Sequence, residues 1–254
     1  MTHLDAYAHK FETITMAREN GILEVTLHGL DGGPLIWNEQ AHRELPDAFA
    51  DIGADEDNRV VIMTGTGDVF CTELDPNAGL GFDSASPMGW DKIYREGRKL
   101  LQNLVDIEVP MIAAVNGPAT VHAELGLLCD IVLASDRTFF QDSRHFTRGG
   151  VPGDGVHVVW PLMLGINRAR YFLLMAEKIS ARDAKDIGFV HEVLAPSDLL
   201  PRAREIAADF ATRLDLTLRY TRVALNLALR RALHEDLSHG LLLEGLGAIN
   251  RAAQ

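Results

Sequence analysis

Three short segments made almost entirely of apolar residues limit what this chain can fold into. They are residues 60–63, 111–115 and 131–134, and the first two end at turns rich in glycine and proline, residues 64–67 and 116–118. Continuous apolar runs of this length are typical of strands buried on both faces of a parallel sheet. Because segments with helical spacing lie between them, the sequence predicts an α/β protein.

The regions around these three segments show other patterns. Near the N-terminus, residues 13–16 and 22–27 flank Glu19-Asn20-Gly21, a turn signal that predicts a β-hairpin. Two helices are expected at 39–51, with a kink or start at Pro46, and at 91–105.

Beyond Val156 strand signals nearly vanish. Helical patterns are expected at 156–164, 167–176, 180–187, 198–213, 217–232 and 235–252, with Ser180 and Ser197 as N-caps. We therefore divide the chain into a core with the active site, residues 1–195, and a C-terminal helical region, residues 196–254. The many leucines of this second region suggest that it mediates oligomerisation. They are Leu225, Leu227, Leu229, Leu241, Leu242 and Leu243.

A glycine-rich loop between the last apolar strand and the next helix carries an imidazole, His145, and a carboxylate, Asp154. A histidine beside an aspartate can hold a water molecule and take its proton, because imidazole titrates near neutrality. Structural roles are the alternative: Asp154 would cap the following helix, and His145 would be satisfied by the backbone.

Composition excludes several classes of function. A net charge of −12 without a cluster of lysine and arginine argues against a nucleic-acid partner, and no apolar run is long enough to span a membrane. Cys71 and Cys129 lie in apolar surroundings, as expected in a reducing compartment, and the N-terminus lacks a signal pattern, so we expect a cytoplasmic protein. With no phosphate loop and no spaced ligand set, neither a cofactor nor a metal is expected.

Four ordered blocks resemble the signatures of the crotonase superfamily. They are residues 60–75, residues 109–131, residues 151–155 and residues 179–190. The resemblance covers nearly the whole chain. It implies a spiral of ββα units with a C-terminal helical region, assembled as homotrimers or dimers of trimers. It also implies two backbone N–H groups that stabilise an enolate, usually of a coenzyme A thioester.

The second and third blocks depart from the pattern of the hydratases in this superfamily. Those enzymes carry a Gly-Gly-Gly run before one catalytic glutamate, whereas residues 119–126 here read Ala-Thr-Val-His-Ala-Glu-Leu-Gly. Pro152 occupies the place of their second glutamate, and Glu124 is offset by one residue from the first. The pair of acids that adds water to an enoyl double bond is therefore missing.

What stands in their place is similar to 6-oxocamphor hydrolase and related β-diketone hydrolases, a branch of the superfamily. The similarity rests on residues 35–37 with 41–45, on His122, on residues 142–146 and 151–161, and on Glu244. It implies retro-Claisen hydrolysis of a carbon–carbon bond in a cyclic β-diketone, without coenzyme A, to give a keto acid.

Candidate catalytic residues follow from the demands of that reaction. His145 and Asp154 would activate water, with the formal base left open between them, and His122 would donate a hydrogen bond to a carbonyl or enolate. The alternative for His122 is a core histidine bonded to the backbone. Glu244 lies in the apolar stretch 241–246, where a lone carboxylate is costly, so we expect it to pair with a histidine.

The expected substrate-binding residues are Trp37, His42, Phe82 and Leu74. Trp37 offers one indole donor on an apolar surface, although it could be plain core, and Leu74 would contribute only its backbone N–H. Phe82 would form a wall of the pocket. For His42, on a predicted helix, exposure on the surface is the stronger expectation.

Two other functions remain open. One is a coenzyme A-dependent hydratase, isomerase or thioesterase, against which the missing glutamates argue. The other is a crotonase-fold protein without catalysis that serves as an assembly or RNA-binding subunit. The negative charge and the presence of His122, His145 and Asp154 argue against it.

Overall fold

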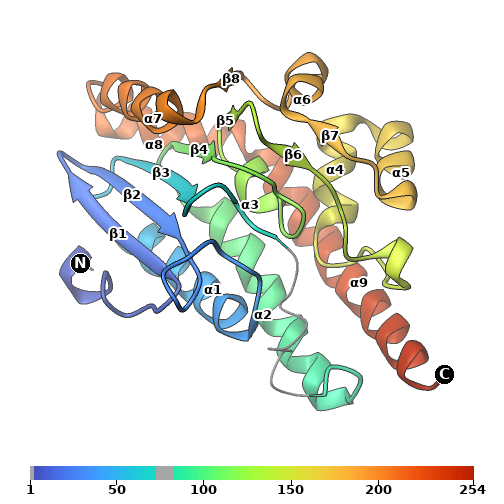
Figure 1. Cartoon of the computed structure of the whole chain (residues 1–254). Coiled ribbons are helices and arrows are strands. Elements are labelled where there is room, and N and C mark those ends of the chain that lie inside the picture. The colour runs from blue at the N-terminus through green and yellow to red at the C-terminus, as the bar shows by residue number, and fades with distance from the viewer. Residues whose placement is uncertain (1–2, 73–82) are drawn as a thin grey trace.

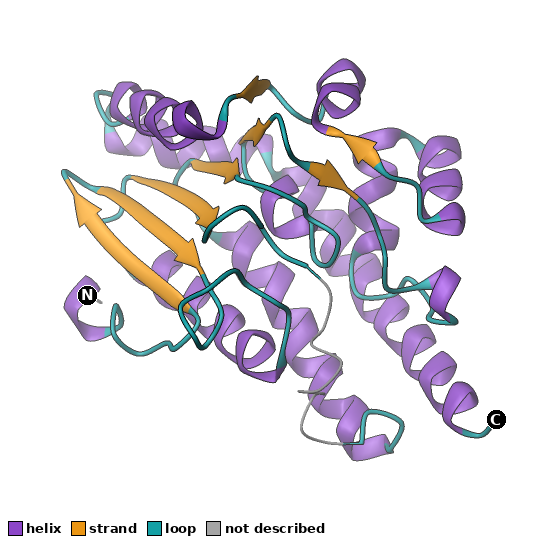
Figure 2. Cartoon of the chain, in the orientation of Figure 1, coloured by secondary structure: helices purple, strands orange, loops and turns teal. Residues whose placement is uncertain are grey.

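A mixed six-stranded sheet forms the centre of the molecule. The computed structural model describes residues 3–72 and 83–254. The sheet order is β1-β2-β3-β4-β5-β8, with β1 antiparallel to β2 and each later pair parallel (Figure 2). These strands are β1 (Ile14–Glu19), β2 (Ile22–Leu27), β3 (Val60–Gly65), β4 (Met111–Val115), β5 (Ile131–Ser135) and β8 (Glu192–Leu194). The predicted hairpin and the three predicted buried strands are thus confirmed, together with the α/β class.

The helices surround the sheet and extend beyond it on one side (Figure 1). They are α1 (Glu39–Ala54), α2 (Pro87–Asp106), α3 (Glu124–Leu127), α4 (Val156–Leu164), α5 (Ile166–Met175), α6 (Ala181–Ile187), α7 (Pro196–Phe210), α8 (Asp215–Leu225) and α9 (Leu227–Ala252). Two 3₁₀ helices, η1 (Leu4–Ala6) and η2 (Phe146–Arg148), and an antiparallel pair, β6 (Phe139–Phe140) with β7 (Ile179–Ser180), complete the described elements.

Side chains alternate between two cores across the parallel strands. Val61 and Met63 of β3 face the larger core, which α1, α2 and α9 complete, whereas Val60 and Ile62 face a smaller one. Helix α7 covers that smaller core with Leu199, Ala203 and Ala207. Because both faces are covered, residues 60–63 of β3 and 111–115 of β4 are apolar at every position, which is the feature the sequence showed.

The C-terminal half differs from the prediction in three places. Strands β6, β7 and β8 were not predicted, because two or three residues carry no usable periodicity. Helix α9 begins at Leu227, several residues before the predicted break between the last two helices. Ser180 caps α6 as predicted, accepting a bond from Asp183 N at 3.2 Å, but Ser197 lies inside α7, which begins at Pro196.

Helix α9 runs beside α2 and α4, and its last turns extend away from the sheet to the C-terminus (Figure 1). Leu233, Leu237 and Leu241 on one face of α9 are fully buried, while Leu242 and Leu243 are exposed. Although α9 has 26 residues, neither it nor any other described helix is apolar enough to cross a membrane.

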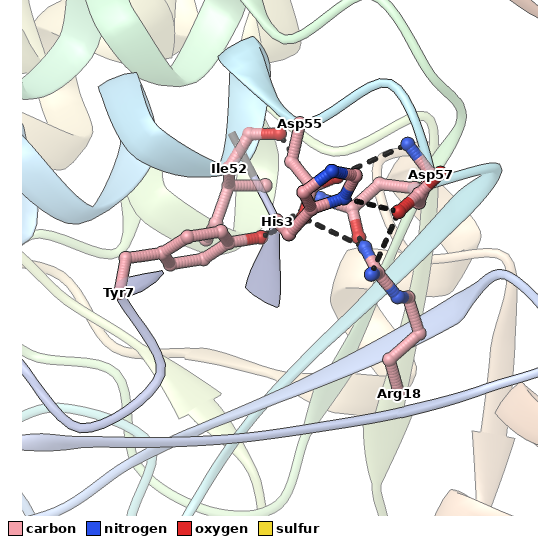
Figure 3. Close-up of polar contacts among 7 residues, drawn as sticks. His3, Tyr7, Arg18, Ile52, Asp55 and Asp57 are labelled. Carbon is pink, nitrogen blue, oxygen red and sulfur yellow. Dashed lines mark hydrogen bonds and ion pairs between the residues drawn. The ribbon is translucent and has the colours of Figure 1, made fainter. Parts of the chain in front are cut away.

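A polar network fixes the N-terminal segment to the edge of the sheet (Figure 3). The Tyr7 hydroxyl donates to Asp55 Oδ2 at 2.8 Å, and Arg18 on β1 donates to the same oxygen at 2.7 Å. Arg18 also pairs with Asp57 at 3.3 Å, and His3 lies 3.0 Å from Asp57. The network ties β1 to the loop after α1, far along the sheet from the loop of His145 and Asp154.

Candidate active site

His145 lies between two carboxylates that come from different parts of the chain. Its Nε2 atom is 3.5 Å from Asp154 Oδ2 and 3.6 Å from Glu244 Oε1. The loop between β6 and α4 supplies His145 and Asp154, and α9 supplies Glu244. The imidazole is buried, with 3% of its surface exposed. Glu244 thus has a histidine beside it, as its position in an apolar stretch required.

The structural alternatives for this loop do not describe what is observed. The N-cap of α4 is Gly155, and no side chain caps this helix. Asp154 Oδ1 is buried and makes no hydrogen bond with the residues described, and the same holds for His145 Nε2. Buried polar atoms left without partners are costly, so atoms that converge in this way point to a site that binds a ligand.

Asp142 is a member of the site that sequence reasoning did not include. His145 donates through Nδ1 to Asp142 Oδ1 at 2.7 Å, which fixes the plane of the imidazole and directs Nε2 toward Asp154 and Glu244. The spacing Asp-x-x-His, with both residues in one loop, was the available signal. A carboxylate that orients an imidazole in this way is a common component of acid–base sites.

The three carboxylates determine the protonation of His145. Burial favours the neutral imidazole, but Asp154, Asp142 and Glu244 together outweigh burial and raise the pKa of His145 far above its ordinary value. Burial also raises the pKa of Asp154, yet the positive charge of His145 lowers it below its ordinary value. Burial raises the pKa of Glu244. The resting site is therefore an imidazolium–carboxylate pair beside a carboxyl group of increased proton affinity.

His122 stands on the other side of Asp154. Its Nε2 atom is 3.7 Å from Asp154 Oδ2, and its ring contacts that of Trp37, with 4.0 Å between centroids. The residue has a φ of 48°, a left-handed conformation that is rare outside glycine and recurs at functional sites. Burial lowers the pKa of His122 to about 4, so the ring is neutral at pH 7 and carries a single N–H donor.

Glu124 lies next to His122. The sequence did not predict a catalytic role for it, because its spacing differs from that of the first catalytic glutamate of the hydratases. It is buried, and Oε2 is 4.0 Å from His122 Nδ1. Burial raises the pKa of Glu124 to about 8, so its carboxyl group holds a proton through the neutral range.

The expected substrate-binding residues have different outcomes. Trp37 is buried against His122, next to the proposed chemistry. The expectation that His42 is exposed is wrong: it is buried, its Nδ1 lies 2.7 Å from Glu96 Oε2, and its ring is 5.9 Å from that of Trp37. Glu96 of α2 supplies the partner that the sequence of α1 alone could not reveal. Leu74 and Phe82 lie outside the described residues.

A cavity of about 230 Å³ opens beside His145 and Glu244. Its wall includes Trp90 and Arg144, neither of which sequence reasoning identified. The Trp90 indole donates to Leu241 O at 2.9 Å and so faces the cavity from a fixed position.

The same three groups could in principle hold a metal ion. His145, Asp154 and Glu244 each offer a ligand atom, and these atoms lie within 4.8 Å of one another. A metal would need the neutral imidazole, whereas the surrounding carboxylates favour the protonated one. That no metal is used remains a prediction.

The comparisons with known proteins identify the class. The model of the enoyl-CoA hydratase/isomerase family matches residues 17–242, so this chain belongs to that family, the crotonase superfamily of enzymes. A relative from Arabidopsis thaliana named "Probable enoyl-CoA hydratase 1, peroxisomal" is 34% identical over 203 residues, 79% of this chain and 72% of the relative.

Among solved structures, the β-diketone hydrolase ABDH of the cyanobacterium Anabaena sp. PCC 7120 is similar over almost the whole chain. It is 51% identical with a TM-score of 0.94, covers 97% of this chain and 98% of its own, and was determined with (S)-3-oxocyclohexyl acetic acid bound. An enoyl-CoA hydratase/isomerase of Mycobacterium paratuberculosis is 26% identical with a TM-score of 0.83, over 94% of each chain. The predicted crotonase fold is thereby confirmed.

Proposed function

We propose that this protein is a cofactor-independent hydrolase that cleaves a carbon–carbon bond of a cyclic β-diketone to give a keto acid. The observation that carries the proposal is the position of His145, with Nε2 3.5 Å from Asp154 and 3.6 Å from Glu244, while the neutral ring of His122 faces the same aspartate from 3.7 Å. The site thus combines a group that can exchange a proton with water and a separate donor for a carbonyl oxygen.

The reaction begins with water placed between the His145–Asp154 pair and one carbonyl carbon of the diketone. The His145–Asp154 pair accepts the proton of water as one unit. The water oxygen bonds to the carbonyl carbon and forms a tetrahedral adduct. His122, with its single N–H, donates to the oxygen of the second carbonyl.

Collapse of the adduct breaks the bond between the attacked carbon and the carbon that joins the two carbonyls. The electron pair of that bond passes into the second carbonyl, where His122 stabilises the enolate oxygen. The pair then returns this proton to the enolate carbon, which gives a carboxylic acid and a ketone in one molecule when the diketone is cyclic. The proton balance closes within the pair, so the reaction needs no oxidant, reductant or coenzyme.

The keto acid bound to the Anabaena enzyme suggests a test substrate. Opening bicyclo[2.2.2]octane-2,6-dione between a carbonyl carbon and the bridgehead that joins the carbonyls gives 3-oxocyclohexyl acetic acid. We expect turnover of this diketone by the purified protein, without added coenzyme A or metal, and formation of that acid in chromatography. We further propose that the natural partner is a free diketone, and neither a nucleic acid nor a membrane, and that the enzyme acts as a homotrimer or a dimer of trimers in the cytoplasm.

The competing function is a coenzyme A-dependent hydration or isomerisation, as the names of many relatives suggest. Crotonyl-coenzyme A assayed beside the diketone separates the two. Turnover of the thioester with no turnover of the diketone would overturn the proposal, and micromolar affinity for an acyl-coenzyme A in calorimetry would count against it.

A further inference from the structure

Arg144 precedes His145 in the chain and lines the cavity that opens beside His145 and Glu244. The segment from Asp142 to His145 therefore presents three charged groups to one small region. Two of them, Asp142 and His145, are bonded to each other at 2.7 Å. The guanidinium of Arg144 takes no part in that bond and is half-buried at the cavity wall.

Among the described residues, no carboxylate forms an ion pair with Arg144. Other sheltered arginines of this protein are paired: Arg222 contacts Asp130, and Arg18 lies 2.7 Å from Asp55. Burial lowers the pKa of Arg144, while the more distant charges of Asp154 and Glu244 act in the opposite direction. A sheltered guanidinium without a direct partner is costly, and an anionic ligand would remove that cost.

The proposed reaction creates such an anion at this place. The attacked carbonyl carbon becomes a carboxylate near Asp142 and Asp154, whose negative charges repel it. Arg144 lines the same cavity, and Arg251 lines it as well. A pocket shaped only for a neutral hydrocarbon diketone has no use for this concentration of positive charge.

We propose that Arg144 is the anion-binding residue of the site and holds the carboxylate of the keto acid as it forms. The inference rests on the proposed function and adds the group that accepts its product. The planar guanidinium can donate two parallel hydrogen bonds to a carboxylate, a geometry that lysine cannot reproduce. Arg251, which is exposed and lines the same cavity, adds positive charge there.

Binding of two isosteric ligands tests this inference without requiring turnover. The first is the anion of 3-oxocyclohexyl acetic acid, and the second is the corresponding amide, which has nearly the same shape and no charge. Calorimetric titrations would use the wild-type protein, Arg144→Gln, Arg144→Lys and the control Arg170→Gln, which removes an exposed charge on α5. We expect Arg144→Gln to weaken the acid about tenfold or more, which is the worth of a charged hydrogen bond, and to change the affinity of the amide less than about twofold.

Arg144→Lys should give an intermediate loss for the acid, and Arg170→Gln should give none. In the wild-type protein, salt should weaken the acid and leave the amide unchanged. If Arg144→Gln does not fold, Arg144→Lys still tests whether the acid and the amide respond differently to a change at this residue. Equal weakening of both ligands would overturn the inference, because Arg144 would then merely balance the nearby carboxylates. Unchanged affinity for the acid in Arg144→Gln would also overturn it.

The two proposals fail separately. A wild-type protein that hydrolyses the diketone, but whose affinity for the acid does not depend on Arg144, rejects the anion-binding role alone. A protein that binds the acid through Arg144 and hydrolyses no diketone rejects the proposed function alone.

Discussion

Gly153 lies so close to Glu244 that a Cβ atom on Gly153 would stand 2.7 Å from the Cβ of Glu244. The same added atom would lie 2.2 Å from the carbonyl oxygen of Gly240, one turn earlier in α9. The backbone beside Asp154 therefore rests directly on the helix that carries Glu244. This contact places the two carboxylates at nearly equal distances from His145 Nε2, 3.5 and 3.6 Å.

We expect Gly153→Ala to separate the loop from α9 and to lower both stability and turnover. Overpacking of this kind costs about 1–3 kcal/mol, and a shift of Asp154 relative to His145 should lower kcat by about tenfold or more. Gly53→Ala is the matched control, because a Cβ there meets only Ile107, at an ordinary 3.6 Å. Thermal melting and steady-state kinetics measure the effects. Wild-type kcat in Gly153→Ala would show that the contact does not position the site.

Much of the fold could be predicted because apolar patterning reports burial directly. Segments buried on both faces, such as 60–63 and 111–115, are apolar throughout, and Asn20-Gly21 adopts the left-handed turn expected of this pair, with φ of 52° and 79°. The two-residue strand at 139–140 could not be predicted, because its pairing with 179–180 is set by tertiary contacts.

Candidate site residues could be predicted where one segment of sequence carries the signal. His145 and Asp154 lie in the same glycine-rich loop, and Glu244 is a carboxylate in an apolar stretch. Residues defined by long-range proximity were missed. His42 is buried because Glu96, on another helix, lies 2.7 Å away. Glu124 is a different case, because it is only two residues from His122: its spacing differs from that of the hydratases, yet its Oε2 lies 4.0 Å from His122 Nδ1. The position of a residue relative to a family motif therefore predicts the role of its side chain less well than the residues that surround it in the fold.

Stability should depend on pH through Glu124. Its pKa is about 8 in the folded protein against an ordinary 4.5, mainly because of burial, so the folded state binds the proton more strongly than the unfolded state. The stabilisation is fully present below about pH 4.5 and is lost as pH rises through 8. Glu124→Gln stays neutral and should lose less stability between pH 6 and 9 than the wild type, by a few degrees in Tm. Glu235→Gln, at an exposed position of α9, is the control. If the Tm of Glu124→Gln and the Tm of the wild type changed equally with pH over this range, the assignment would be contradicted.

Chelation should leave activity intact. Although His145, Asp154 and Glu244 could hold a metal by geometry, the carboxylates keep the imidazole protonated, and a metal would have to displace that proton. After dialysis against EDTA we expect kcat within about twofold of the untreated enzyme, and inhibition by added Zn²⁺ that weakens at low pH. Activity that disappears on chelation and returns with Zn²⁺ or Mn²⁺ would refute the metal-free mechanism.

We expect the exposed leucines of the C-terminal helices to be buried at the interface between subunits. Leu225 is 73% exposed and Leu242 56% exposed, whereas Leu241, also expected to contribute, is fully buried within the chain. We expect sedimentation as a trimer or hexamer, and dissociation when Leu225 and Leu242 are both replaced by lysine. Leu30→Lys, which changes an exposed leucine far from these helices, is the control. A wild-type monomer that is stable at micromolar concentration would contradict the expected trimer.

The roles of the His145–Asp154 pair and of His122 can be distinguished by steady-state kinetics. His145→Ala and Asp154→Asn should each lower kcat by roughly 10²–10⁴, the range for general acid–base groups, and the double variant should lose little more, because either change disables the same unit. His122 donates to a carbonyl oxygen that is present before the reaction, so His122→Ala should also raise KM.

Isotopes test the same mechanism at the level of atoms. Hydrolysis in ¹⁸O-water should place the label in the new carboxylate, and hydrolysis in ²H₂O should place deuterium on the carbon that left as the enolate. Arg170→Gln serves as a control for the loss of one charged residue outside the cavity. Near-wild-type turnover in both His145→Ala and Asp154→Asn would exclude this pair as the source of the base. Glu244 would then be the next candidate, because burial raises its pKa and it lies in the same cluster.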